Sequence, residues 1–173
     1  MKRIAIAYWL LPAEPARSFF QEVINHLARR YGAPPFEPHL TIHVGSNRAG
    51  TAEKALSMVA RDCKLVTLKM LEIDHSTEFM KTLFVQYAMT AQLQQLNQSI
   101  RTATQDSSDY RLNPHLSLLY KRISNHEQRL LTRSIEVPFM EVKFDSLKAV
   151  RCISPTQNRA DVEAWRIVAE KAL

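Results

Sequence analysis

The chain has 173 residues, of which 46% are hydrophobic, 23% are charged and only three are glycine, so its composition excludes a disordered or fibrous protein. No apolar run is long enough to span a membrane, and the length suits one domain or one compact pair of lobes. The net charge of +6 favours an anionic ligand, but the basic residues are scattered and form no stripe typical of a nucleic-acid interface.

The N-terminal segment has two interpretations. Lys2 and Arg3 precede the apolar run 4–11, as in a signal peptide. Because this run is short and no small-residue cleavage site follows it, we expect a strand and a cytoplasmic protein. Cys63 and Cys152 lack the spacing of metal ligands, so we expect free thiols, no bound metal and no cofactor; whether the two approach each other is left open.

The hydrophobic periodicity predicts helices mixed with strand hairpins. The expected elements are strand 3–11, helix 12–30, strand 39–45, helix 51–61, strands 65–74 and 82–89, helix 90–104, strand 115–120, helix 124–135, and strands 142–153 and 165–171. This order favours the α+β class over a doubly wound parallel sheet. We therefore expect residues 1–173 to form a single bilobal domain, with two similar lobes of antiparallel sheet, flanking helices and a central cleft.

Two short segments of the chain nearly repeat each other. Residues 38–42 read Pro-His-Leu-Thr-Ile, and residues 114–118 read Pro-His-Leu-Ser-Leu. In each segment apolar and polar residues alternate, which is typical of a strand with one buried face. The histidine and the hydroxyl residue of each motif should therefore point to the same side of a strand.

The paired motifs supply the groups for cutting a phosphate ester. His39 and His115 provide two imidazoles, one to take a proton and one to give it, because an unperturbed pKa of about 6.5 allows both protonation states near neutral pH. Thr41 and Ser117 provide hydroxyls that can hold phosphate oxygens. A chance pair of such motifs remains an alternative on the residues alone, and neither motif indicates which histidine is the base.

The two motifs resemble those of the two-histidine (2H) phosphoesterase superfamily, and most closely its plant and yeast cyclic phosphodiesterase branch. The resemblance extends to 36–41, to 115–120 with its tyrosine, and to the opening Trp-Leu-Leu-Pro at 9–12. It implies that His39 and His115 form the acid–base pair and that Thr41 and Ser117 hold phosphate. The bacterial RNA-ligase-like branch is second, because His-Val-Gly at 43–45 replaces the aromatic residue usual there.

Three other residues are candidates with open alternatives. The resemblance implies that Tyr120 contacts the ligand, although regular strand periodicity would point it away from His115 and Ser117. By the same periodicity His43 shares a face with His39, and it either assists the site or continues the strand toward solvent. Trp9 either stacks on a nucleobase at the cleft edge or packs in the core.

The resemblance implies a metal-independent cyclic phosphodiesterase that acts on a small nucleotide or nucleotide-sugar cyclic phosphate. ADP-ribose 1″,2″-cyclic phosphate and nucleoside 2′,3′-cyclic phosphates are the implied substrates, and we expect a monomer. One alternative is an enzyme acting on RNA ends, as a 2′,3′-cyclic phosphodiesterase or a ligase-like enzyme. Another is a nucleotide-binding or RNA-binding module without turnover, although binding alone would not need two titratable imidazoles.

Overall fold

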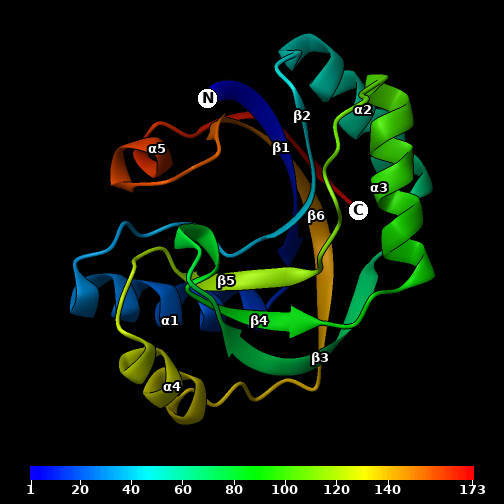
Figure 1. The fold of residues 1–173 in the computed structure, drawn as a ribbon. Helices are drawn as coiled ribbons and strands as arrows, with labels where there is room; N and C mark the ends of the chain where they lie inside the picture. Colours follow the sequence, from blue (N-terminus) through cyan, green and yellow to red (C-terminus); the bar gives the residue numbers. More distant parts are fainter.

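The computed structural model describes residues 1–173 and contains one antiparallel sheet with flanking helices (Figure 1). The strands are β1 (Arg3–Pro12), β2 (Leu40–Ser46), β3 (Val66–His75), β4 (Leu83–Tyr87), β5 (His115–Leu119), β6 (Glu141–Ser154) and β7 (Arg166–Ala172). The helices are α1 (Ala16–Tyr31), α2 (Ala49–Asp62), α3 (Ala91–Thr104), α4 (Asn125–Ser134), α5 (Arg159–Glu163) and the 3₁₀ turn η1 (Phe79–Lys81). The predicted α+β class is confirmed, and no helix has the length and apolar character needed to cross a membrane.

Six of the seven strands form a closed ring. The strand order is β1-β2-β5-β4-β3-β6-β7, and a further pairing of β1 with β6 completes the ring, which leaves β7 outside it on β6. The 14-residue strand β6 joins the two halves, because its first residues pair with β3 and the rest pairs with β1. The two motif strands, β2 and β5, therefore meet on the opposite side of the ring from β6.

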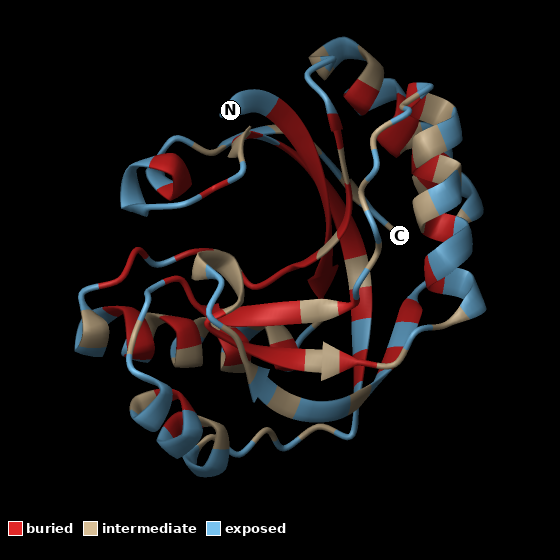
Figure 2. Cartoon of the chain, viewed as in Figure 1, coloured by how far each residue is buried: buried red, intermediate tan, exposed pale blue.

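Helices cover the outside of each half of the ring. In Figure 1, α2 and α3 lie side by side over β2 and β7, while α1 lies along β5 and α4 packs against β3 and β4. The buried residues face the strands and the exposed residues face outward on every long helix (Figure 2). This arrangement places the helices behind the strands and leaves the motif residues free of helical cover.

Strand β1 pairs with β2 and β6 at its two edges, and it is buried on both faces by two separate hydrophobic clusters. Ile6, Tyr8 and Leu10 belong to the main hydrophobic core. Trp9 and the alternate residues around it form a second, smaller cluster on the other face, with Trp165 packed against them. The continuous apolar run in the sequence thus forms a central strand, as expected.

The prediction that the first helix begins at Pro12 is wrong. Pro12 is the last residue of β1, where it still pairs with Phe144, and the helix begins at Ala16. The helix ends where expected, because Gly32 adopts a left-handed conformation (φ 59°) and its N–H donates to the carbonyl of Ala28. Periodicity did not predict η1 or α5, since elements of three and five residues are too short to show a helical repeat.

Candidate functional site

The two motifs lie side by side in the sheet. Leu40 of β2 pairs directly with Leu116 of β5, and each leucine is the residue between the histidine and the hydroxyl residue of its motif. Because the strands are antiparallel, this register sets the histidine of one motif beside the hydroxyl residue of the other. The four residues that flank the leucine pair therefore lie on one face of the sheet.

Both motif histidines are oriented in the same way. Nδ1 of His39 lies 2.6 Å from the carbonyl oxygen of Glu37, and Nδ1 of His115 lies 2.8 Å from the carbonyl oxygen of Asn113. Each acceptor is two residues upstream, across the proline that precedes the histidine. A carbonyl can only accept, so each Nδ1 carries the proton and donates it. Neither Nε2 has a hydrogen-bond partner in the chain, which leaves both nitrogens for a ligand.

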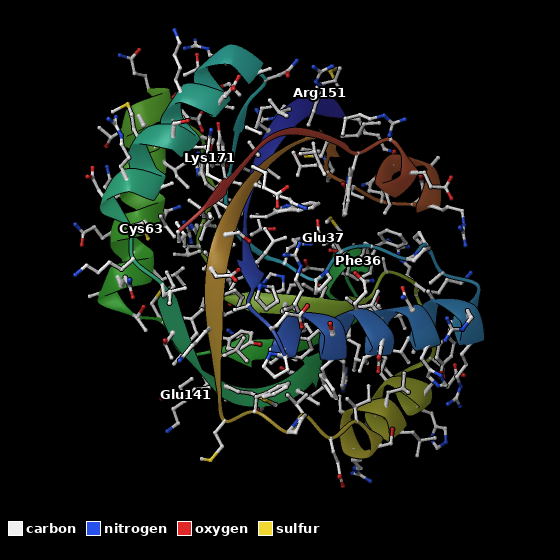
Figure 3. The ribbon with its side chains drawn as sticks, turned by 180° about the vertical axis from the view of Figure 1, so that it is seen from behind. Phe36, Glu37, Cys63, Glu141, Arg151 and Lys171 are labelled. Carbon is white, nitrogen blue, oxygen red and sulfur yellow. The ribbon has the colours of Figure 1, made fainter.

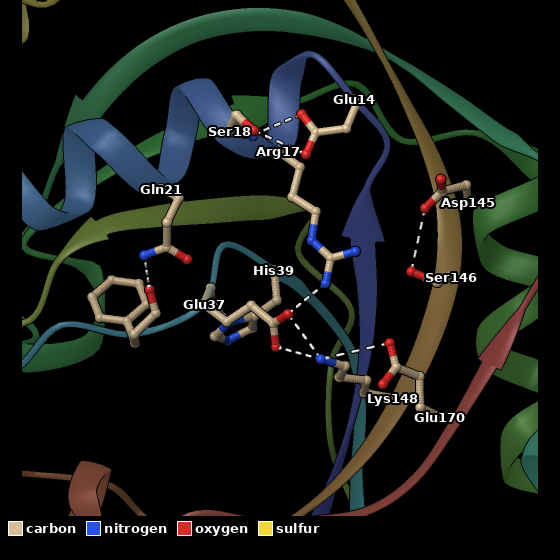
Figure 4. Close-up of polar contacts among 11 residues, drawn as sticks. Glu14, Arg17, Ser18, Gln21, Glu37, His39, Asp145, Ser146, Lys148 and Glu170 are labelled. Carbon is tan, nitrogen blue, oxygen red and sulfur yellow. Dashed lines mark hydrogen bonds and ion pairs between the residues drawn. The ribbon is translucent and has the colours of Figure 1, made fainter.

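Charged side chains fix Glu37, the residue that orients His39. Its carboxylate accepts hydrogen bonds from Lys148 at 2.7 and 2.8 Å and from Arg17 at 2.6 Å (Figure 4). Lys148 is almost fully buried, and Glu170 lies 3.6 Å from its ammonium group. Burial alone would raise the pKa of Glu37, but the bonds from Lys148 and Arg17 outweigh it and lower that pKa. Glu37 is therefore ionised and anchored from two elements.

The second motif is anchored by neutral groups. The side-chain amide of Gln86, on β4, donates to Oδ1 of Asn113 at 3.0 Å and to the carbonyl of Pro114 at 2.9 Å. Gln86 also pairs with His115 across the two strands. The two histidines thus share one geometry but differ in what supports it: an ion-pair network for His39 and an amide for His115.

His39 is buried among aromatic rings. Its imidazole stacks on Trp9 with a centroid distance of 3.7 Å, and Trp165 approaches its edge at 5.9 Å. Burial lowers the pKa of His39 to about 4, the bond to Glu37 opposes this, and the nearby charges of His115 and Lys148 add to it. His39 is therefore neutral at pH 7. Because its ring face is occupied by His39, Trp9 matches the core-packing alternative.

His115 is more open than His39. Phe84 meets its ring edge-on at 5.5 Å, and the ammonium group of Lys81 lies 4.5 Å from the centroid of the Phe84 ring. Burial lowers the pKa of His115, its bond to Asn113 raises it, and the positive charge of Lys81 lowers it further. Lys81 is thus a cation beside the second histidine that the sequence patterns did not single out.

The two hydroxyl residues differ in what they bind. The Ser117 hydroxyl donates to the carbonyl of Met80, in η1, at 2.5 Å, whereas the Thr41 hydroxyl has no partner in the chain. Thr41 pairs with Trp9 on β1, so its side chain lies on the face that carries Trp9 and His39. Thr41 is therefore free to donate to a ligand, and Ser117 would have to exchange one acceptor for another.

Tyr120 lies just beyond the end of β5, so its side chain need not point away from His115 and Ser117. Because the strand ends at Leu119, the strand alternation does not apply to Tyr120. Its ring stacks on Phe36 at 3.7 Å and is fully buried. Burial raises the pKa of its phenol, and the neighbouring Ser117 hydroxyl opposes the rise. The phenol therefore reaches the second motif although its ring is part of the core.

The prediction that His43 shares a face with His39 and Thr41 is wrong. Tyr8 pairs with His43 but Trp9 pairs with Thr41, so one step along β1 corresponds to two steps along β2. This β-bulge reverses the alternation, and His43 points to the opposite face, where its ring stacks near Tyr8 at 6.0 Å. It is fully buried, so the solvent alternative is wrong as well.

His43 forms a buried pair with Asp106, whose side chain is only 4% exposed. Their Nε2 and Oδ2 atoms are 2.6 Å apart. Burial lowers the pKa of His43, although Asp106 opposes this. Burial alone would raise the pKa of Asp106, but hydrogen bonds from His43 and Ser46 lower it to about 2. A neutral imidazole therefore donates to a carboxylate, and Nδ1 of His43 has no partner.

The segment 105–113, which leads from α3 to the second motif, runs beside β2 (Figure 1). Its Tyr110 hydroxyl donates to the carbonyl of Thr41 at 2.9 Å, and its Ser108 hydroxyl donates to the carbonyl of Val44 at 2.8 Å. Between them, the side-chain amide of Asn97 on α3 donates to the carbonyl of Ile42 at 2.6 Å. Side chains thus bind the outer edge of the first motif strand and tie it to the approach of the second.

Sequence patterns missed four residues that surround the histidines. They are Glu37, Lys81, Lys148 and Trp165. Figure 3 shows Glu37 and Phe36 in the middle of the molecule, between α1 and the segment that carries α5. Cys63, which follows α2, lies apart from them in this view. Only Glu37 gave a signal, since it precedes the Pro-His of the motif. Cys63 and Cys152 are both free, as expected.

The site brings two Nε2 atoms and two hydroxyls together on the adjacent strands β2 and β5, with Lys81 of η1 beside His115 and Lys148 of β6 near His39. Such a set can accept a proton, donate one and hold anionic oxygens at once. No group of three or more His, Cys, Asp or Glu side chains is placed to hold a metal ion.

Comparisons with known proteins identify the family of this chain. The model of the cyclic phosphodiesterase-like protein family matches residues 4–173. The chain is 23% identical over 175 residues to a cyclic phosphodiesterase of Arabidopsis thaliana, an alignment that covers 98% of this chain and 95% of that protein. The expected likeness to the plant branch is thereby confirmed.

Solved structures show the same fold at low identity. Escherichia coli LigT complexed with 3′-AMP aligns with a TM-score of 0.54 and 17% identity, covering 99% of this chain and 98% of that one. TT0787 of Thermus thermophilus aligns with a TM-score of 0.59 and 13% identity, covering 98% and 97%. Together with the family match over nearly its whole length, the paired motifs show that this chain belongs to the cyclic phosphodiesterase-like protein family.

Proposed function

We propose that the protein hydrolyses a small ribose cyclic phosphate without a metal ion, with His39 and His115 as the acid–base pair. The observation that carries the proposal is the matched orientation of the two imidazoles. Each donates Nδ1–H to a carbonyl two residues upstream and keeps Nε2 free, on strands joined at the Leu40–Leu116 pair. A protein that only binds its ligand has no need of this duplicated geometry.

The reaction needs one proton taken and one given. Nε2 of one histidine accepts a proton from water as the water oxygen forms a bond to phosphorus. The protonated Nε2 of the other donates to the ribose oxygen as its bond to phosphorus breaks, and a phosphomonoester remains. The hydroxyls of Thr41 and Ser117 stabilise the negative charge on the phosphate oxygens, with Lys81 close to His115.

The substrate is a nucleotide or nucleotide sugar. The Arabidopsis relative is a cyclic phosphodiesterase, and Escherichia coli LigT has been crystallised with 3′-AMP, ATP and NADP⁺. The activity of the relative and the nucleotide ligands of LigT support ADP-ribose 1″,2″-cyclic phosphate and nucleoside 2′,3′-cyclic phosphates as substrates. From the family resemblance, we expect a nucleoside 2′,3′-cyclic phosphate to yield the 2′-phosphate.

Turnover of these two substrates in excess EDTA tests the proposal. We expect His39→Ala and His115→Ala each to lower kcat by about 10²–10⁴-fold while phosphate-containing ligands still bind, because acid–base catalysis has that value. Thr41→Val and Ser117→Ala should each lower kcat by about tenfold, since each removes one hydrogen bond. Near-normal rates in either histidine variant, or activity lost in EDTA and restored by a divalent ion, would overturn the mechanism.

Salt dependence separates a small substrate from an RNA end. A mononucleotide makes few phosphate contacts, so its kcat/KM should change little with added salt, whereas an oligonucleotide with a cyclic end would show a steep decline. We expect the small substrates to be preferred at low and moderate salt. A hundredfold preference for the oligonucleotide that collapses with salt would favour RNA-end processing instead.

A further inference from the structure

A cavity of about 590 Å³ lies next to the motif residues and is lined by cations. Lys121 and Arg122 follow Tyr120 beyond the end of β5, and Arg159 of α5 lines the same cavity. No acidic side chain lines this cavity. Its wall therefore carries three positive charges drawn from two segments that are distant in the sequence.

Two of these cations have no partner in the chain. Lys121 and Arg122 are exposed and form no hydrogen bond or ion pair, whereas nearby charges such as Lys148 and Arg17 are paired with Glu37. Arg159 is held in place, because its guanidinium donates to the carboxylate of Glu163 and to the carbonyl of Gly32, both at 3.0 Å. The bond to Gly32 spans the cavity wall and fixes the position of α5 relative to the end of α1.

Tyr120 connects this cavity to the histidines. Tyr120 is one of the residues that line the cavity, and its phenol neighbours the Ser117 hydroxyl. The same ring stacks on Phe36, which meets the edge of His39 at 6.2 Å. A ligand whose cyclic phosphate sits at Ser117 would have its far end near the part of the cavity that Lys121 and Arg122 line.

We propose that this cavity binds a second phosphate group of the substrate, carried on the ribose opposite the cyclic phosphate. This inference rests on the proposed function and narrows it to cyclic phosphates whose ribose also carries a phosphate or diphosphate at its 5-position. A guanidinium and an ammonium bind phosphate oxygens through charge-assisted hydrogen bonds. The second phosphate contributes mainly to binding, because it lies away from the bond that breaks.

A pair of substrates that differ by one phosphate tests the proposal. We would measure kcat/KM for a nucleoside 2′,3′-cyclic phosphate with a free 5′-hydroxyl and for the same compound with a 5′-phosphate. The wild-type protein should prefer the 5′-phosphate by about three- to tenfold through KM, since contacts to solvent-exposed cations are individually modest. The Lys121→Ala/Arg122→Ala double variant should lose this preference and keep its rate on the 5′-hydroxyl substrate.

Matched variants make the result specific. Arg133→Ala, which removes an exposed cation on α4, should leave the preference intact, and Arg122→Lys should retain most of it. The preference surviving in the double variant, or falling equally in Arg133→Ala, would overturn the proposal.

A binding measurement separates this proposal from the proposed function. If the wild-type protein turns over neither substrate, the proposed function fails, but calorimetry with a nucleoside 5′-diphosphate and the parent nucleoside still reports on the cavity. The diphosphate should bind more tightly than the nucleoside, and the double variant should abolish the difference. Equal affinities for the two compounds in the wild-type protein would contradict the second phosphate site.

Discussion

Asp106 accepts a buried hydrogen bond of 2.6 Å from His43, 63 residues earlier in the chain. His43 follows the first motif, and Asp106 begins the segment that leads to the second. A Cβ at Gly45 would clash with the Asp106 carboxylate, so this glycine leaves the space that the carboxylate occupies. The pair therefore holds the two motif segments together on the face of β2 opposite to His39 and Thr41.

Asp106→Asn tests this connection. An amide leaves part of the buried His43–Ser46 network unsatisfied, so we expect the free energy of unfolding to fall by about 1–3 kcal/mol. Because the segment before His115 is loosened, kcat should fall several-fold while KM changes little. Urea unfolding and steady-state kinetics measure both effects. Asp109→Asn, an exposed change in the same segment, is the control and should behave as wild type.

Glu37 should matter for the rate although it does not touch the substrate. Glu37→Gln keeps the backbone carbonyl that binds His39 but removes the charge that balances Lys148 and Arg17. We expect kcat to fall about tenfold with little change in KM, because the His39 ring loses its fixed orientation. Glu22→Gln, an exposed substitution on α1, serves as the matched control. Unchanged kcat in Glu37→Gln would show that the ion pairs do not position the ring.

The lowered pKa values predict an acidic optimum for kcat/KM. One histidine must be neutral and the other protonated, and the free protein has a pKa of about 4 at His39 and a pKa below the usual 6.5 at His115. The bell-shaped pH profile of kcat/KM should therefore peak between about pH 4 and pH 6.5, whichever histidine is the base. Bound anionic substrate favours the protonated imidazole, so the kcat profile should lie at higher pH. A kcat/KM that rises steadily from pH 5 to pH 10 would exclude the pair.

Stability should decline in acid for the same reason. His39 is neutral in the folded protein down to about pH 4, but it takes up a proton near pH 6.5 when unfolded. Because the unfolded state then binds more protons, the contribution of His39 is fully present above pH 6.5 and is lost as the pH falls toward 4. The free energy of unfolding, measured with denaturant at pH 7.5 and pH 5, should fall less between these two pH values in His39→Gln than in the wild type. An equal loss in both proteins would mean that His39 does not titrate in this range.

Local patterns predicted the elements better than the contacts between them. The alternation at 38–42 and 114–118 placed both motif strands to within a residue or two, although β5 is buried on both faces from Leu116 to Leu119. The same alternation failed at His43, since the bulge depends on how β1 pairs with β2 and leaves no trace in the sequence of β2 alone. Periodicity holds only as far as the pairing is regular.

The residues that surround the motif histidines could not be predicted from the sequence for a different reason. Lys148 lies 111 residues from Glu37, and nothing in the sequence around either residue indicates an ion pair. Tyr120 was assigned to the ligand by resemblance, but its orientation depended on β5 ending at Leu119. Long-range pairings decide these cases, and a single sequence does not display them.

The side chains along β2 also bear on how the protein behaves in a crowded solution. An uncovered strand edge offers carbonyl groups with which a strand of another molecule can pair, and such edges promote aggregation. Here Tyr110, Asn97 and Ser108 occupy three of those carbonyls, so these three groups of the first motif strand cannot pair with a foreign strand. The segment that carries the chain toward its second histidine thereby also keeps the strand of the first from recruiting other molecules.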